Sequence, residues 1–255
     1  MSKRMGDLPE KTKGEFSLVQ LIPNMLTIAA ICAGLSAIRY GVQGNFVFAV
    51  QLIVVAGVLD GLDGRMARLL GSDSAMGAEL DSLADFLNFG VAPPLILYFW
   101  ALQDMNSAAW FSVLVFAVCC VVRLARFNVS SKAETDQPPS PHFTGVPSPA
   151  GALLVLLPMF ATFAFPNTLV LPELVICAYM VVIGLLLISR VPTWSFKTTK
   201  VSRHNVKYYL VGVAVVAAAV LTYVWTTLVV LCLAYMVVVL WSLFTGRVPG
   251  FGGKS

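Results

Sequence analysis

The chain has 255 residues, of which 58% are hydrophobic and only 12% are charged, and its net charge is +4. Soluble globular proteins carry about 25% charged residues, so this composition leaves too little polar surface to cover a particle in water. It predicts a polytopic membrane protein and excludes disordered, collagen-like and disulfide-stapled classes.

Eight apolar segments follow a polar N-terminal segment, residues 1–20, that does not have the pattern of a signal peptide. Each is long enough to cross a hydrocarbon layer of about 30 Å as a helix of about 20 residues. The expected spans are residues 21–40, 46–68, 77–100, 108–127, 147–165, 169–189, 208–225 and 228–244. The predicted fold is an all-α transmembrane bundle, with a six-span core at residues 21–190 and a basic loop with two further spans at residues 191–255.

Lysine and arginine gather on one side of these spans. If residues 1–20 are cytosolic, Arg39 is the only one of the seventeen basic side chains on the outer side. Such a bias sets the orientation of membrane proteins, with the basic side facing the cytoplasm. We therefore expect an integral membrane protein whose N-terminus is cytoplasmic. The membrane that we expect is the inner membrane of a bacterium. Nucleic-acid binding is not expected, because no aromatic residues are interleaved with the basic ones for base stacking.

Acidic residues are concentrated in one stretch with strongly apolar flanks. Six of the thirteen lie between Asp60 and Asp85. A carboxylate near the bilayer centre costs about 2.5–3.5 kcal/mol, so several together need cations, a watery cavity, or both. Asp60 and Asp63 are three residues apart, and Asp81 and Asp85 are four apart, so each pair shares one face of its helix. We expect the two helices, joined by a short cytosolic turn, to bring the pairs together.

Converging carboxylates repel one another unless divalent cations neutralise them, and hard oxygen ligands suit Mg²⁺, Mn²⁺ or Ca²⁺. Gly64, Ala67 and Gly77 keep the same surface bare, so a phosphorylated ligand can approach the backbone. Arg68 is a natural bidentate partner for a phosphate oxygen. Helix capping is a weaker explanation of the aspartates, because a cap needs one acid at a helix start.

These residues also match a family signature. They occupy every fixed position of the pattern D-x-x-D-G-x-x-A-R-x8-G-x-x-x-D-x-x-x-D between residues 60 and 85. The pattern resembles that of the CDP-alcohol phosphatidyltransferases, which are integral membrane enzymes that displace CMP from a CDP-linked lipid or alcohol with a hydroxyl nucleophile. The resemblance implies that the aspartates bind a pair of divalent metal ions and that Asp85 is also the catalytic base. It further implies that the CDP site is lined by Gly64, Ala67, Arg68 and Gly77.

Looser matches cover about residues 20–150. Pro23-Asn24 with Thr27, and the segments DFLNFGVAP, RLARFN and FTGVPSP, resemble the members of this family that use CDP-diacylglycerol and L-serine. Ala30 departs from that pattern, since many such members have Asn there. The resemblance implies phosphatidyl transfer from CDP-diacylglycerol to L-serine at a membrane lipid surface, and a homodimeric assembly.

Three polar residues outside the signature each have two possible roles. Arg123 and Arg126 are either anchors that snorkel to the interface or ligands of the serine carboxylate or a lipid phosphate. Asn88 makes either an ordinary interhelical hydrogen bond or a substrate contact.

The reaction has alternatives as well. In place of L-serine, the acceptor of the phosphatidyl group could be glycerol-3-phosphate, inositol phosphate or choline. A cation transporter is the alternative class, because intramembrane acids also mark ion pathways.

Overall fold

The computed structural model describes residues 18–72, 74–133, 143–166, 171–189, 192–193 and 206–245. Helices dominate these residues, which confirms the all-α prediction, and one antiparallel pairing joins β1 (Phe143–Thr144) to β2 (Pro192–Thr193). The helices are α1 (Leu18–Val42), α2 (Phe46–Leu70), α3 (Ala75–Asp85), the π-helix η1 (Phe86–Val91), α4 (Ala92–Ala101), α5 (Asn106–Ala133), α6 (Ser148–Val155), α7 (Leu157–Ala164), α8 (Glu173–Ile188), α9 (Val206–Thr222) and α10 (Val224–Thr245). The expected N-terminal segment before residue 18 and nearly all of the basic loop before residue 206 lie outside the described residues.

Five helical runs are long and apolar enough to cross a membrane, and they make this chain an integral membrane protein. They are Leu21–Val42, Phe46–Leu70, Ala75–Ala101, Ser107–Ser130 and Val224–Leu243. The third run joins α3, η1 and α4 end to end. These five correspond to the first, second, third, fourth and eighth of the expected spans.

The prediction of eight full-length spans is not confirmed. The expected span at residues 147–165 is divided into α6 and α7, because Pro158 has no N–H to donate to the carbonyl of Leu154. The hydroxyl of Tyr179 in α8 donates to that carbonyl instead, at 2.6 Å. Helix α8 has 16 residues and α9 has 17, lengths of about 24 and 26 Å that fall short of a hydrocarbon core of about 30 Å.

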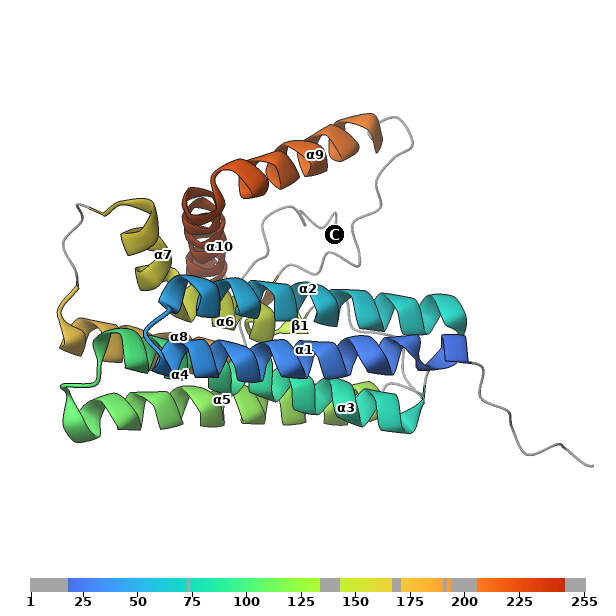
Figure 1. Ribbon diagram of the computed structural model, residues 1–255, viewed down its shortest axis with the longest axis horizontal. Coiled ribbons are helices and arrows are strands. Elements are labelled where there is room, and N and C mark those ends of the chain that lie inside the picture. The colour runs from blue at the N-terminus through green and yellow to red at the C-terminus, as the bar shows by residue number, and fades with distance from the viewer. Residues whose placement is uncertain are drawn as a thin grey trace, which may run out of the picture.

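The bundle is built around α1, which packs on α2 along its length and also contacts α3, η1 and α4. Figure 1 shows these helices running together along the long axis of the molecule, with α5 and α8 beside them. The largest fully buried side chains include Ile96, Phe116 and Met180, which lie in α4, α5 and α8, and Phe160 in α7, which packs on α10. Helix α9 lies apart from this bundle and packs on α10 (Figure 1).

The π-helix η1 begins immediately after Asp85. Pro93 and Pro94 follow it, and neither has an N–H for the carbonyl four residues earlier. The chain widens its turn instead, so that the N–H of Ala92 bonds the carbonyl of Leu87, five residues back. A wide turn of this kind is rare and occurs often at functional sites.

Candidate functional site

The turn between α2 and α3 brings the two halves of the acidic motif together. Gly71 ends α2 with φ of 58°, a left-handed conformation that favours glycine. Its N–H, and the N–H of Ser72, bond the carbonyl of Ala67. Ser74 then caps α3, because its side-chain oxygen accepts the N–H of Gly77 at 3.0 Å. This tight reversal returns α3 against α1 and α2.

The four aspartates of the motif converge as expected. The carboxyl groups of Asp60 and Asp85 lie within hydrogen-bonding range of each other, across α2 and α3. Asp81 interacts electrostatically with both Asp60 and Asp63. The structure therefore places the acids of both helices in one cluster.

Two carboxylate oxygens of this cluster are buried and have no hydrogen-bond partner in the part of the chain that the structure describes. Asp63 is 3% exposed, and the hydroxyl of Thr27 in α1 donates to its Oδ2 at 2.6 Å. Its other oxygen, Oδ1, has no hydrogen-bond partner among the described residues, and neither has Oδ1 of Asp60. Buried polar atoms are almost always paired, so these two oxygens indicate a place for a donor or a cation.

The residues fit a divalent cation by their chemistry. Four carboxylates offer only hard oxygen ligands, and two of their buried oxygens have no partner among the residues described. Within the described ranges, no three acidic, histidine or cysteine side chains stand close enough together to enclose an ion. The donors are thus gathered, but they do not form a complete coordination shell in this structure.

A cavity of about 360 Å³ opens beside the cluster, between α1, α2, the turn and α3. All four residues predicted to contact CDP line it, together with two of the aspartates. The predicted residues in its wall are Asp63, Gly64, Ala67, Arg68, Gly77 and Asp81. A Cβ on Gly77 would lie 2.9 Å from Oδ1 of Asn24, so a larger residue at this position would require the Asn24 amide to move.

Arg68 lies along the rim of this cavity. Its Nε donates to the carbonyl of Gly64 at 2.9 Å, which folds the guanidinium back over the bare surface of that glycine. The side chain remains exposed. It can therefore present its other N–H groups to an anion in the cavity.

Four further polar residues line the same cavity and were not among the predicted site residues: Asn24, Thr27, Ser72 and Ser74. Asn24 and Thr27 belong to a segment that resembles the serine-using members of the family, and that match was the available signal. Ser72 and Ser74 lie in a turn, where serine is common, so their positions gave no signal.

The two arginines of α5 have different partners. Nη1 of Arg123 donates to Oγ of the fully buried Ser148 at 2.8 Å, and its guanidinium interacts electrostatically with Asp85. Nη1 of Arg126 donates to the carbonyl of Ile188, at the C-terminal end of α8. Arg123 is therefore beside the acidic cluster, whereas Arg126 caps a neighbouring helix.

Asn88 lies in η1 and is completely buried. Neither of its amide atoms has a hydrogen-bond partner in the described part of the chain, so it does not make the interhelical hydrogen bond that the sequence allowed. Its amide packs directly against Gly34 of α1.

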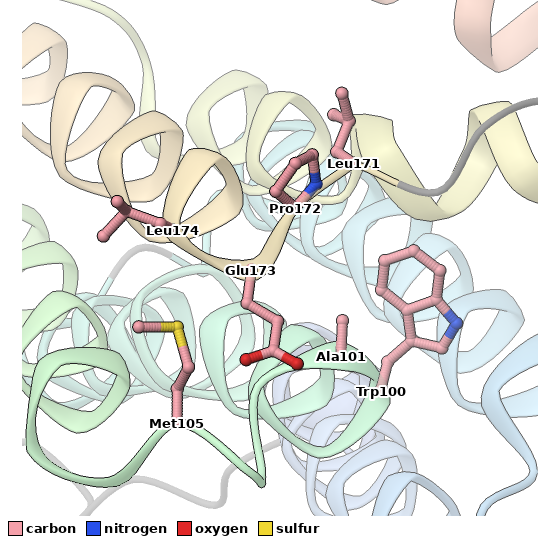
Figure 2. A pocket seen from close by; sticks show the side chains of 7 residues that line it. All are labelled: Trp100, Ala101, Met105, Leu171, Pro172, Glu173 and Leu174. Carbon is pink, nitrogen blue, oxygen red and sulfur yellow. The ribbon is translucent and has the colours of Figure 1, made fainter.

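A larger pocket, of about 700 Å³, lies at the opposite end of the bundle. Figure 2 shows its walls, where Glu173 is the only charged side chain among bulky apolar residues such as Trp100 and Met105. It contains none of the predicted site residues. The cavity beside the aspartates is therefore the better candidate for a site that handles phosphates.

Comparison with known proteins identifies the family of the chain. Residues 20–189 match the family described as CDP-alcohol phosphatidyltransferase. A relative from Mycobacterium leprae named CDP-diacylglycerol--serine O-phosphatidyltransferase is 38% identical over 223 residues, which are 86% of this chain and 73% of the relative. A relative of the same name from Helicobacter pylori (strain ATCC 700392 / 26695) is 39% identical over 184 residues, or 71% of this chain and 74% of the relative.

The fold and the acidic cluster thus define an integral membrane transferase. The chain belongs to the CDP-alcohol phosphatidyltransferase family. Its helices α9 and α10 lie beyond the residues that match the family as a whole.

Proposed function

We propose that this protein transfers the phosphatidyl group of CDP-diacylglycerol to the hydroxyl of L-serine, giving phosphatidylserine and CMP. The observation that carries the proposal is the convergence of four aspartates beside a cavity lined by glycines and an arginine. The names of the relatives from Mycobacterium leprae and Helicobacter pylori support serine as the acceptor.

The aspartates, namely Asp60, Asp63, Asp81 and Asp85, would hold the divalent metal, which we propose to be a pair of Mg²⁺ or Mn²⁺ ions, with Ca²⁺ as a further candidate. Bound there, the metal would neutralise the diphosphate and stabilise the charge that develops on the leaving CMP.

The protein's own residues bind and orient the reactants. Gly64, Ala67 and Gly77 leave room for the nucleotide diphosphate against the backbone, and Arg68 holds one of its phosphate oxygens. Asp85 takes the proton from the serine hydroxyl as that oxygen attacks the lipid-side phosphorus. The bond from that phosphorus to the CMP oxygen breaks, and CMP leaves.

Arg123 is the residue that we propose to bind the acceptor. It lies beside Asp85, so a serine carboxylate on its guanidinium would keep the serine hydroxyl near the base. Arg126 is a second candidate, for a lipid phosphate, because it lines a cavity of about 610 Å³ together with Arg123, while one of its nitrogens bonds the carbonyl of Ile188.

We further propose that the site faces the cytoplasm from the inner membrane of a bacterium, and that the protein is a homodimer. The bias of lysine and arginine toward one side of the spans supports the orientation.

Purified enzyme in detergent tests the reaction directly. With CDP-diacylglycerol and Mg²⁺ or Mn²⁺, we expect CMP release that depends on L-serine and matches phosphatidylserine formation. Asp85→Asn should lower kcat by at least about a hundredfold, because the base and one of the proposed metal ligands are lost together. Asp104→Asn is the matched control, since Asp104 is exposed in the loop after α4 and should be neutral.

Each part of the proposal can fail separately. CMP release without serine, or with glycerol-3-phosphate, inositol phosphate or choline in its place, would assign a different reaction. Near-normal turnover by Asp85→Asn would remove Asp85 as the base while leaving the acceptor assignment in place.

A further inference from the structure

Helix α10 brings a tyrosine to the acceptor end of the site. Tyr235 is half-buried and packs against the hydrophobic core, and its hydroxyl oxygen is buried. No hydrogen-bond partner for that oxygen exists among the residues that the structure describes. A buried hydroxyl without a partner among the described residues is unusual, so this oxygen is a candidate to bond a ligand.

The Tyr235 side chain lies near Arg123. The two interact electrostatically, although they come from α10 and α5. Helix α10 reaches this position because it packs on α6 and α7, and α6 begins with Ser148, the residue that accepts the hydrogen bond from Arg123. Arg123 of α5 therefore interacts with Asp85 of α3 and with Tyr235 of α10.

The ring of Tyr235 has an apolar setting. It lines a cavity of about 210 Å³ between α6 and α10, whose other walls are Leu153, Leu154, Leu228 and further small or apolar residues. An apolar wall offers no competing acceptor for the hydroxyl.

We propose that Tyr235 is a specificity-determining residue, whose hydroxyl donates to the carboxylate of the amino-acid acceptor while Arg123 binds the same group. The inference rests on the proposed function and adds α10 to the site. Asp85 receives the hydroxyl end of the acceptor, and the Arg123–Tyr235 pair receives its carboxylate end. An amino alcohol without a carboxylate leaves the buried hydroxyl of Tyr235 without an acceptor and gives Arg123 no charged partner, and sites of this kind discriminate against the poorer analogue.

The test is Tyr235→Phe, which removes only the hydroxyl. We expect the KM for L-serine to rise about tenfold, the usual order for a hydrogen bond to a charged group. The KM for CDP-diacylglycerol should change less than about twofold, because the hydroxyl does not contact the lipid nucleotide. The preference for L-serine over serinol, which replaces the carboxylate with a second hydroxymethyl group, should fall by about the same tenfold factor.

Tyr223→Phe is the matched control, since Tyr223 is exposed between α9 and α10. Thermal unfolding with and without CMP checks that Tyr235→Phe is folded and still binds nucleotide. An unchanged KM for serine, or an equal loss of kcat with serine and serinol, would overturn the role of Tyr235 while the proposed reaction stands. A wild-type enzyme that does not use serine would overturn both.

Discussion

Thr27 connects α1 to the acidic cluster through a single hydroxyl. Its Oγ1 lies 2.6 Å from Oδ2 of Asp63 and 3.1 Å from the carbonyl of Pro23 in its own helix. When Asp63 is ionised, the Thr27 hydroxyl donates its hydrogen bond to the carboxylate and not to the Pro23 carbonyl, because a hydrogen bond to a charged acceptor is the stronger one. Thr27 thus fixes one oxygen of Asp63 and leaves the other, Oδ1, for a ligand.

Replacing Thr27 with valine removes that hydroxyl at nearly constant volume. Asp63 would then be held less firmly, and we expect the metal concentration for half-maximal activity to rise by about tenfold. The measurement is a titration of activity with Mg²⁺ at saturating substrates. Thr222→Val is the control, because Thr222 likewise bonds the carbonyl four residues back but is exposed at the end of α9. Equal metal dependence in the two variants would contradict the positioning role of Thr27.

Residue spacing predicted the acidic cluster but not which residues from other helices lie around it. Asp60, Asp63, Asp81 and Asp85 converge because helical periodicity and a short turn fix their directions, and both are local properties of the chain. Arg123 and Arg126 share a helix face, yet their long side chains end on different partners, Ser148 and the carbonyl of Ile188. Tyr235 is more than 100 positions from Arg123, so no local pattern could bring the two together.

At the scale of elements, η1 is joined to α1 by a close contact between Gly34 and Asn88. A Cβ on Gly34 would overlap Oδ1 of Asn88. The glycine therefore lets the π-helix approach α1, and it does so next to Asp85, the residue before η1. Close packing at this point positions the start of the π-turn relative to the acidic cluster.

Gly34→Ala should destabilise the protein, because either Asn88 or the whole of η1 must move away from α1. Overpacking of this kind costs about 1–3 kcal/mol. The loss should appear as a lower Tm in detergent, and Gly34→Ala combined with Asn88→Ala should recover most of it, since the overlapping amide is then absent.

Gly212→Ala is the control for that experiment, because a Cβ at Gly212 of α9 meets nothing within 4 Å. Equal Tm values for Gly34→Ala and Gly212→Ala would refute the tight contact. If the Tm of the double variant stayed as low as that of Gly34→Ala, the overlap would not be with Asn88.

Element boundaries were less predictable than residue clusters. Apolar length alone predicted a continuous helix at residues 147–165, but Pro158 divides it, and Tyr179 from α8 satisfies the carbonyl that the proline leaves. Whether a proline bends or breaks a helix depends on such a partner, which the sequence of the segment does not contain. The π-helix was unexpected for a similar reason, since the pair Pro93-Pro94 also fits an ordinary helix start.

At the scale of the whole molecule, the two ends of the bundle differ in chemistry. The end at the α2–α3 turn has the acidic cluster, Arg68 and Arg123, whereas the end at the loop after α4 has the pocket around Trp100 and Glu173. A membrane between these ends would allow only one of them to meet water-soluble substrates from the cytoplasm. Orientation therefore decides which pool of serine and CMP the site can exchange with.

Cysteine labelling can determine that orientation. Ala75 is exposed at the acidic end and Gln103 is exposed at the opposite end, so each accepts a reporter cysteine without loss of a buried contact. In intact spheroplasts of a bacterial host, a membrane-impermeant thiol reagent should label Gln103→Cys and not Ala75→Cys. This result is expected because lysine and arginine concentrate on the side of the acidic cluster, which places that side in the cytoplasm. Both variants should react after the membrane is permeabilised.

Wild-type protein is the background control, since four of its native cysteines are buried and Cys32 is inside a membrane-crossing helix. Labelling of Ala75→Cys in intact spheroplasts would reverse the proposed orientation and require that the enzyme draw its serine from outside the cytoplasm.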